Sequence, residues 1–416
     1  MSFDTIDSDS FNKMMIIWDL GKRCNFDCSY CTGYMHNNYS PHSSIEELKT
    51  TAAHLNEYYE IYKQHHSDDW TKATISFTGG EPVVNPAFFE LAAHIKEQYS
   101  ENFNLGLTTN GTWHPDKHQE ILKYFSGMTI SYHTEGPEKL KQRAKENMLL
   151  IKNSPDANTW LTVNVMMHAE HFEECVDLIE NFLIPNDIAF TPRVIGDGSS
   201  FNSDWFPDTD GIMRKVVHTY DAWQLEYMKT FWDKKNAEVS GNKLQDSTTS
   251  TEEPQEKSLE PDYKEKSNQK QVGRKLGRMC CGGRTLCLRD SETKEWDKLK
   301  FVNDTRFKGW DCMVNWFFLH IEQGNDLVYH HQTCRADFNG ATGPIGTITE
   351  FDKINLFLRE QIEANGTIPI ITCPNSMCGC GMCVPKSNDR EAFQEMFDKH
   401  TIGIKGVYRD STDLPE

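Results

Sequence analysis

The sequence lacks a long apolar run. No stretch approaches the ~20 consecutive apolar residues that a transmembrane helix requires, so we expect no membrane span. It also lacks a secretory signal, because its first residues, "MSFDTIDSDSFNK", are polar and acidic. Basic residues are fewer than acidic residues: the chain has 43 Lys and Arg and 62 Asp and Glu, which gives a net charge of −19. Nucleic acids and anionic membranes attract basic surfaces, so we expect neither as a partner. Because the sequence lacks both a membrane span and a secretory signal, we expect a cytoplasmic protein.

Cysteine, in contrast, is plentiful, with 13 in a chain of 416 residues. Thiols stay reduced in a compartment without oxidising machinery, so we do not expect disulfide bonds in a protein that lacks a secretory signal. The cysteines also fall in clusters along the chain, which favours metal ligation over isolated structural roles.

The first half of the chain alternates short apolar runs with amphipathic stretches. Six runs rich in β-branched and apolar residues predict buried parallel strands at 14–19, 74–78, 105–110, 128–133, 161–167 and 188–194. Helical periodicity lies between them, with a capping-box signature at Ser43 or Ser44. Six β/α units fall short of the eight that close a barrel. We therefore predict an α/β fold with an open, partial (β/α)6 TIM-like barrel, whose chemistry lies at the carboxyl ends of the strands.

The composition changes after residue 235. Residues 236–275 contain almost no large apolar side chains and predict a flexible linker or insertion. Nine of the thirteen cysteines follow it. There, "NWFFLHI" and "LVYHH" flank the turn signal "EQGND" and predict a β-hairpin between Cys312 and Cys334. We predict three parts: a barrel at 1–235, the linker at 236–275 and a small cysteine-rich α+β domain at 276–416.

The motif "CNFDCSYC" places Cys24, Cys28 and Cys31 directly after the first predicted strand. A structural zinc site is closed by four ligands, whereas three thiolates on one loop leave a fourth position open. An iron–sulfur cluster in which one iron has no protein ligand requires three such thiolates and an open fourth position. The alternative is a zinc site completed by a distant residue.

Polar motifs follow the next three predicted strands: "TGGEP" from Thr78 to Pro82, then "TTNGT", then "SYHTEG". All of them belong at the same end of a parallel barrel. The paired glycines allow close approach of the backbone to a ligand, and Glu81 is able to accept a hydrogen bond from an amine. His133 and Glu135 of "SYHTEG" are candidates for substrate contact, although such a histidine more often bonds to local backbone.

Taken together, CxxxCxxC after the first strand, with Tyr30 before its last cysteine, and GGEP after the second strand resemble the radical S-adenosylmethionine (SAM) superfamily. The resemblance covers about residues 14–200. It implies that Cys24, Cys28 and Cys31 hold a catalytic [4Fe–4S] cluster, whose fourth iron binds SAM. It also implies reductive cleavage of SAM to a 5′-deoxyadenosyl radical, which abstracts hydrogen from a substrate.

The same resemblance assigns the residues that would bind SAM. The GGEP motif would contact the methionyl amine, and Tyr30 would lie near the adenine. Asn110 lies at the same barrel end. A serine on the fourth strand, an arginine on the following helix and two residues of the last two strands would contact the carboxylate, ribose or adenine. The predicted cofactor-binding set is Tyr30, Gly79, Gly80, Glu81, Asn110, Ser131, Arg143, Asn164 and Arg193.

The tail ends in "CPNSMCGCGMCVPK", with four cysteines within eleven residues. With the predicted hairpin before it, this tail resembles the SPASM or twitch extensions of radical SAM enzymes, which hold one or two auxiliary [4Fe–4S] clusters. Its spacing differs from the usual SPASM string, and an additional "CCGGRTLC" precedes the hairpin, so the resemblance leaves the ligand set of each cluster open. A zinc ribbon is the alternative. The candidate ligands are Cys280, Cys281, Cys287, Cys312, Cys334, Cys373, Cys378, Cys380 and Cys383.

By this resemblance the chain is an oxidoreductase-like enzyme that modifies a peptide or protein by oxidation, crosslinking or epimerisation. A small-molecule dehydrogenase or epimerase is one alternative, and a non-catalytic iron–sulfur or zinc protein is another. The resemblance implies a flavodoxin- or ferredoxin-type reductant. Because the first predicted strand begins at residue 14, we expect no fused peptide-recognition domain, so that substrate recognition needs either a separate partner or none.

Overall fold

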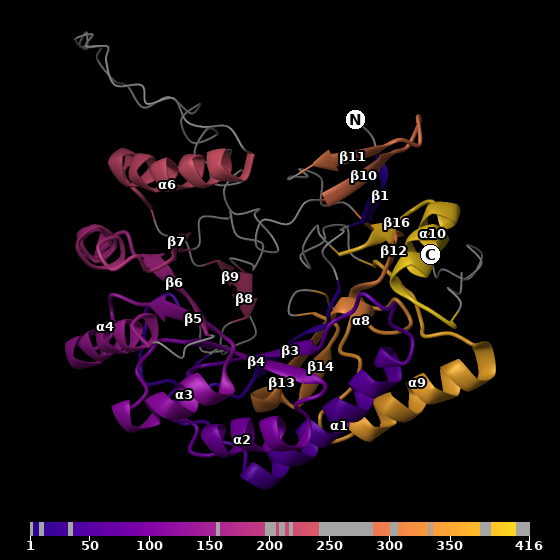
Figure 1. Cartoon of the computed structure of the whole chain (residues 1–416), viewed down its shortest axis with the longest axis horizontal. Helices are drawn as coiled ribbons and strands as arrows, with labels where there is room; N and C mark the ends of the chain where they lie inside the picture. The colour runs from indigo at the N-terminus through magenta and orange to yellow at the C-terminus, as the bar shows by residue number, and fades with distance from the viewer. Residues whose placement is uncertain are drawn as a thin grey trace.

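The computed structural model describes residues 3–7, 12–31, 36–154, 159–195, 205–207, 213–215, 219–240, 286–299, 307–331, 334, 336–374 and 384–404. Within them the chain forms an eight-stranded sheet, a six-stranded sheet and a pair of short strands, β8 (Trp205–Pro207) and β9 (Met213–Lys215). Figure 1 shows the larger sheet wrapped on its outer side by helices, with the smaller sheet beside it.

The larger sheet has the strand order β14-β13-β2-β3-β4-β5-β6-β7. All neighbouring strands from β13 to β7 run parallel, and β14 runs antiparallel to β13. The apolar runs predicted six of these strands, and the predicted α/β class with a partial parallel barrel is confirmed. Their bounds are β2 (Met15–Asp19), β3 (Ala73–Thr78), β4 (Phe103–Thr109), β5 (Gly127–Tyr132), β6 (Trp160–Met167) and β7 (Phe190–Val194).

Helices cover the outer face of this sheet (Figure 1). Helix α1 (Ile45–Lys63) begins with the predicted capping box. The Ser44 hydroxyl accepts a hydrogen bond from the Glu47 amide, and the Glu47 carboxylate accepts one from the Ser44 amide. The helices are α1 (Ile45–Lys63), α2 (Phe88–Gln98), α3 (His118–Tyr124), α4 (Glu138–Lys152), α5 (Phe172–Asp177) with its π-helical continuation η3 (Leu178–Leu183), and α6 (Ala222–Ser240); the short turns η1 (Pro82–Val84) and η2 (Pro115–Lys117) follow β3 and β4.

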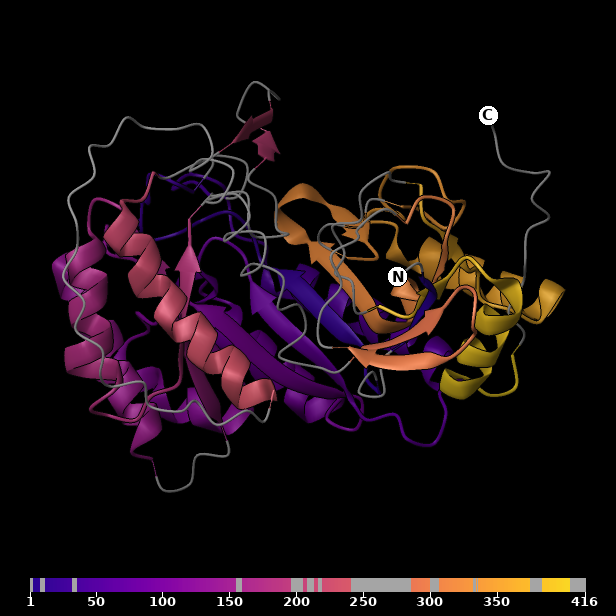
Figure 2. The same cartoon turned by 90° about the horizontal axis from the view of Figure 1, so that it is seen from above.

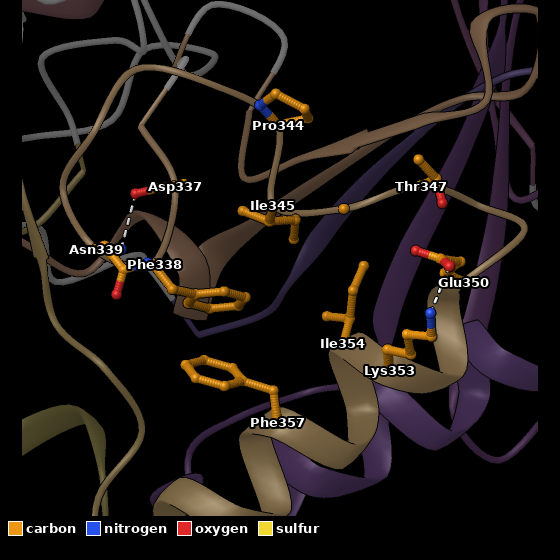
Figure 3. A pocket seen from close by; sticks show the side chains of 11 residues that line it. Asp337, Phe338, Asn339, Pro344, Ile345, Thr347, Glu350, Lys353, Ile354 and Phe357 are labelled. Atoms are coloured by element: carbon orange, nitrogen blue, oxygen red, sulfur yellow. Dashed lines mark hydrogen bonds and ion pairs between the residues drawn. The ribbon is translucent and has the colours of Figure 1, made fainter.

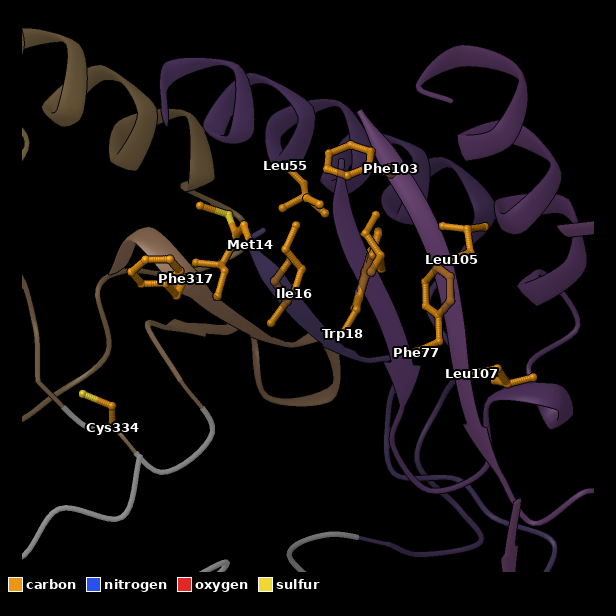
Figure 4. Close-up of a cluster of buried hydrophobic side chains, with 14 of the residues drawn as sticks. Met14, Ile16, Trp18, Leu55, Phe77, Phe103, Leu105, Leu107, Phe317 and Cys334 are labelled. Atoms are coloured by element: carbon orange, nitrogen blue, oxygen red, sulfur yellow. The ribbon is translucent and has the colours of Figure 1, made fainter. Parts of the chain in front are cut away.

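Side chains along the strands alternate between the helices and the barrel interior. Ile16, Trp18 and Phe77 are fully buried, and Figure 4 shows them in one cluster with Leu55 of α1. The alternate residues on three of the strands are polar and half-exposed, because they face the interior: Thr74, Ser76, Thr78, Thr129, Ser131, Thr162 and Asn164. The barrel interior therefore presents hydroxyl and amide groups to any polar ligand that enters it.

The predicted hairpin is present and lies in the barrel sheet. Its strands are β13 (Phe318–Glu322) and β14 (Leu327–Tyr329), joined through the turn η5 (Gln323–Asn325). β13 pairs in parallel with β2, in a register that sets Glu322 beside Asp19. The cysteine-rich third of the chain thus supplies two strands of the barrel, next to the strand that precedes the cysteine triad.

The smaller sheet contains a strand from the N-terminus that the apolar pattern did not predict. In the order β11-β10-β1-β16-β12-β15, strand β1 lies between two strands from the C-terminal third. Figure 2 shows these C-terminal elements together on one side of the barrel, opposite α4 and α6. Their bounds are β1 (Phe3–Asp7), β10 (Leu286–Asp290), β11 (Trp296–Leu299), β12 (Asp311–Cys312), β15 (Ile371–Thr372), β16 (Lys386–Ser387), α8 (Val314–Phe317), α9 (Phe351–Asn365) and α10 (Arg390–His400).

The two ends of the chain are also joined by an ion pair. The buried Asp7 carboxylate accepts hydrogen bonds from His400 Nε2 at 2.9 Å and Lys399 Nζ at 2.7 Å. Burial alone would raise the pKa of Asp7, but the hydrogen bonds and charges of His400 and Lys399 outweigh it and lower the pKa to about 2. The unfolded carboxyl has a pKa near 3.8. The stabilisation is therefore fully present above pH 3.8 and is lost as pH falls toward 2.

We expect Asp7→Asn to lower the free energy of unfolding at pH 7 by about 2 kcal/mol, since it leaves His400 without its anion. Asp187→Asn is the matched control, because Asp187 pairs with Lys152 on the surface. Urea denaturation of both variants measures the difference. Equal stability of the two variants would contradict a stabilising role for the terminal ion pair.

The predicted division into three parts remains a prediction. β1 of the predicted barrel segment pairs in the smaller sheet, and β13 of the predicted tail pairs in the barrel sheet. α6 continues through Ser240, past the predicted linker start at 236, and residues 241–275 of that linker lie outside the described residues. No helix in the described part of the chain has the length and apolar character to cross a membrane.

Candidate active site

The cysteine triad lies at the carboxyl end of β2, on the loop that follows it. Cys28 is buried and Cys24 and Cys31 are half-buried, and none of the three forms a disulfide. The loops after β3, β4 and β5 reach the same edge of the barrel, because these strands run parallel to β2. Each of the three loops hydrogen-bonds to the cysteine loop.

The loop after β3 bonds directly to the backbone that precedes Cys24. The Gly80 amide donates to Gly21 O at 2.7 Å, and the Glu81 amide donates to Arg23 O at 2.9 Å. A Cβ atom at Gly80 would lie 2.4 Å from the carbonyl oxygens of Lys22 and Arg23. The close approach that the glycine pair predicted is therefore found, and the partner is the cysteine loop itself.

Glu81 uses its carboxylate inside the protein. It accepts hydrogen bonds from Thr109 Oγ1 at 2.6 Å, from the Asn110 amide at 2.6 Å and from the Val83 amide at 3.2 Å. Burial raises the pKa of Glu81 to about 7, although these three hydrogen bonds oppose the rise. A carboxylate has about four acceptor positions, so the three bonds leave room for one more donor. Contact with the methionyl amine stays a prediction.

The loop after β4 holds the cysteine loop through Asn110, which is buried. Its Nδ2 donates to Asn25 Oδ1 at 2.7 Å, and Asn25 Nδ2 donates to Thr112 Oγ1 at 2.8 Å. Thr112 closes the ring, because its hydroxyl donates to Asn110 Oδ1 at 2.6 Å. This closed ring fixes the position of Asn25, the residue that follows Cys24.

The loop after β5 holds the far end of the cysteine motif. The Ser29 amide donates to Glu135 Oε2 at 2.8 Å. The Tyr30 hydroxyl lies 2.5 Å from His133 Nδ1, and the two rings stack with centroids 5.9 Å apart. Burial lowers the pKa of His133 to about 4, so its ring is neutral near pH 7. In this arrangement His133 and Glu135, the candidates for substrate contact, position the residues between Cys28 and Cys31.

The three thiols fit an iron–sulfur cluster by the chemistry of the donor set. Burial raises the pKa of Cys24 to about 11 and those of Cys28 and Cys31 to about 12, and the mutual repulsion of the thiolates adds to the rise at Cys28 and Cys31. A bound cationic centre removes this cost and holds all three as thiolates. The described residues contain no group of three His, Cys, Asp or Glu side chains around one metal-ion position. A cluster does not need one, since each thiolate would bind a different iron.

Three of the predicted SAM-binding residues meet on neighbouring strands of the barrel interior. Ser131 of β5 is directly opposite Asn164 of β6. Asn164 Oδ1 accepts a hydrogen bond from Arg193 Nε of β7 at 3.1 Å. Arg143 is not part of this group: it lies half-buried on α4, with no ion pair to any described residue.

Sequence reasoning missed two carboxylates at the mouth of the barrel. Asp19 and Glu322 are aligned at the ends of β2 and β13, and the Asp19 carboxylate accepts the Gly21 amide at 2.9 Å. Burial raises the pKa of Asp19 to about 7, and the nearby charge of Glu322 adds to the rise. No local signal marks this pair, because it depends on pairing between strands 300 residues apart along the sequence.

In the cysteine-rich part, Cys312, Cys334 and Cys373 line one cavity. Cys312 and Cys334 are buried, Cys373 is half-buried, and none forms a disulfide. The other walls of the cavity are Phe307, Trp310, Val314, Ile371 and Lys386. Three thiol donors within a mainly apolar shell suit an iron–sulfur cluster, in which each thiolate would bind a different iron.

The remaining cysteines separate into three cases. Cys287 lies on β10 opposite Asp7, so it faces the side of the smaller sheet away from Cys312. Cys175 is buried in α5, as its helical position predicted, and its thiol donates to Met166 O at 3.4 Å. The other predicted ligands lie outside the described residues: Cys280, Cys281, Cys378, Cys380 and Cys383.

A separate pocket of about 260 Å³ lies between α9 and the loop that precedes it. Figure 3 shows Phe338 facing Phe357 of α9, with Glu350 paired to Lys353 at the start of the same helix. It contains none of the predicted site residues, and it lies in the C-terminal part of the chain. We do not assign it to the chemistry of the barrel.

A comparison with protein families supports the interpretation of the barrel. Residues 18–182 match the family model described as the Radical SAM superfamily. No curated protein matches the chain. Among solved structures, the chain resembles Streptococcus suis SuiB bound to S-adenosylmethionine, with 16% identity and a TM-score of 0.37 over 56% of this chain and 48% of that chain.

Two further structures are similar to the chain. One is anSMEcpe with bound AdoMet, at 15% identity and a TM-score of 0.37 over 55% of this chain and 62% of that chain. The other is BtrN in complex with AdoMet and 2-DOIA, at 14% identity and a TM-score of 0.28 over 44% of this chain and 70% of that chain. The chain thus spans about half the length of the SuiB chain that it resembles.

Proposed function

We propose that the chain is a radical SAM enzyme acting on a peptide or protein; residues 18–182 match the family model described as the Radical SAM superfamily. The observation that carries the proposal is the support given to the cysteine triad. The loops after β3, β4 and β5 each hydrogen-bond to the loop that follows β2 and carries the three thiols. Three thiols held at the open end of a barrel suit a [4Fe–4S] cluster with one iron free for SAM.

In this proposal Cys24, Cys28 and Cys31 hold the cluster, which supplies reductive cleavage of SAM and removal of a hydrogen atom from the substrate. The chain itself fixes the loop, excludes water and orients SAM. Glu81 offers its remaining acceptor position to the methionyl amine, and Tyr30 lies near the adenine. Ser131, Asn164 and Arg193 line the adjoining wall and suit the ribose or carboxylate.

We further propose that Cys312, Cys334 and Cys373 hold an auxiliary iron–sulfur cluster. The shared cavity and the all-thiol donor set support this assignment. The predicted cysteines that lie outside the described residues would complete this cluster or form a second one. An auxiliary cluster could accept the second electron of a substrate oxidation, which a peptide-modifying oxidoreductase requires. A flavodoxin- or ferredoxin-type protein would reduce the barrel cluster.

A small-molecule substrate is the second candidate. The polar interior of the barrel, with its row of threonine, serine and asparagine side chains, favours it, since these groups suit a sugar or alcohol as well as SAM. The two candidates differ in the source of the hydrogen atom that is removed.

The function is tested by reducing the reconstituted protein with dithionite in the presence of SAM and measuring 5′-deoxyadenosine. Its formation is expected, and its absence would refute the enzyme. The substrate class is tested by adding a peptide fraction or a small-metabolite fraction from deuterium-grown cells. Deuterium transfer to 5′-deoxyadenosine from the peptide fraction is expected. Transfer from the small-metabolite fraction alone would refute the peptide assignment and favour the second candidate.

A further inference from the structure

One buried cation lies among the cysteines of the tail. Lys386 of β16 is only 1% exposed, and its side chain lines the cavity that Cys312, Cys334 and Cys373 also line. Its ammonium lies 4.5 Å above the ring centre of Phe307, another wall of the same cavity. Lysine is among the residues least often buried to this extent, because desolvation of its charge is costly.

The strand register explains why Lys386 and a thiol share the cavity. In the smaller sheet, Lys386 of β16 is directly opposite Cys312 of β12, and Cys312 is directly opposite Ile371 of β15. Side chains directly opposite in an antiparallel pair lie on the same face, with Cβ atoms about 5 Å apart. Cys373 is two residues after Ile371 along the chain and faces the same cavity.

We propose that Lys386 is the counter-charge of the auxiliary iron–sulfur cluster and raises its reduction potential. This inference rests on the auxiliary cluster of the proposed function. A cluster bound by thiolates carries net negative charge, which increases by one when the cluster takes up an electron. A fixed positive charge at the cavity wall stabilises the reduced form more than the oxidised form, so the potential rises. Lys386 would thereby make the auxiliary cluster a better electron acceptor.

The test uses Lys386→Met, which keeps the length and apolar stem and removes the charge. Lys386→Arg keeps the charge, and Lys353→Met removes the charge of an exposed helix lysine as the control. All are made in the full-length chain with Cys24, Cys28 and Cys31 replaced by alanine, so that only auxiliary clusters remain. The measurement is the midpoint potential from an EPR-monitored titration with dithionite, together with iron and sulfide content.

We expect Lys386→Met to lower one auxiliary midpoint so that the ratio of reduced to oxidised cluster at a fixed potential falls at least tenfold, which is 59 mV for a one-electron couple. Lys386→Arg and Lys353→Met should have the same midpoint potential as the Cys24/Cys28/Cys31→Ala chain in which they are made. An unchanged midpoint in Lys386→Met, with its iron retained, would overturn the inference and leave the cluster in place.

Two other outcomes are also decisive. If Lys386→Met loses its iron while Lys386→Arg retains it, the charge is needed to hold the cluster, which supports the inference. If Lys386→Arg loses its iron as well, the cluster depends on the size and shape of the lysine side chain and not on its charge, and the inference fails. If the background chain with intact Lys386 binds no iron, the auxiliary cluster is absent, and that part of the proposed function fails first.

Discussion

Replacing Cys24, Cys28 and Cys31 together by alanine is expected to reduce SAM cleavage below detection and to remove about four irons per chain after anaerobic reconstitution. The reason is that these thiols are held at the barrel mouth by three loops and, in the proposed function, would provide the protein ligands of the catalytic cluster. The measurements are 5′-deoxyadenosine formation and the iron and sulfide content of wild type and variant.

Cys175→Ala is the matched control, since this thiol is buried in a helix away from the triad. It should retain its iron and its SAM cleavage. Irons that remain in the triple variant count the auxiliary clusters. Equal iron in wild type and triple variant would contradict the assignment of the triad, and zinc in place of iron in the tail would exclude an auxiliary cluster there.

Gly80→Ala is expected to release the catalytic cluster without touching a cysteine. Its added Cβ would lie 2.4 Å from two carbonyl oxygens of the backbone that precedes Cys24, so the two loops must separate. Overlap of this kind costs about 1–3 kcal/mol or more when neither side is free to move. We expect the iron content to fall by up to about four per chain and SAM cleavage to fall at least about tenfold.

The iron count is made before SAM is added, because a glycine needed only to contact SAM would leave the cluster intact. Gly343→Ala is the control, since a Cβ at Gly343 meets no atom within 4 Å. It should match wild type in iron and in SAM cleavage. Full iron in Gly80→Ala would show that the GGEP loop does not support the cysteine loop.

Much of the barrel could be predicted because its signals are local. Buried parallel strands read as short runs of β-branched and apolar residues, and all six predicted runs are strands. The meeting of the motif loops at one edge follows from parallel strands alone. The pairing of Ser131 with Asn164 follows from the parallel alignment of the neighbouring strands β5 and β6.

The elements that sequence reasoning missed depend on contacts between distant segments. β1 has only five residues and is held by β10 and β16 from the other end of the chain. β13 satisfies the hairpin pattern locally, and nothing in that pattern reveals that its second edge pairs with β2. Asp19 and Glu322 meet only through this pairing. The number of cysteines also does not reveal on which face of a sheet each thiol lies. Side chains alternate between the two faces of the smaller sheet, and its register places Cys287 and Cys312 on opposite faces.

In the proposed site the triad leaves one iron of the cluster free, and SAM binds to this iron. The open coordination position is tested most directly by the EPR spectrum of the dithionite-reduced wild-type protein before and after addition of SAM. We predict that the signal absent from the Cys24/Cys28/Cys31→Ala variant is the one that shifts when SAM is added. If SAM leaves that signal unchanged, or if the triple variant retains it, the open coordination position does not exist and the account is contradicted.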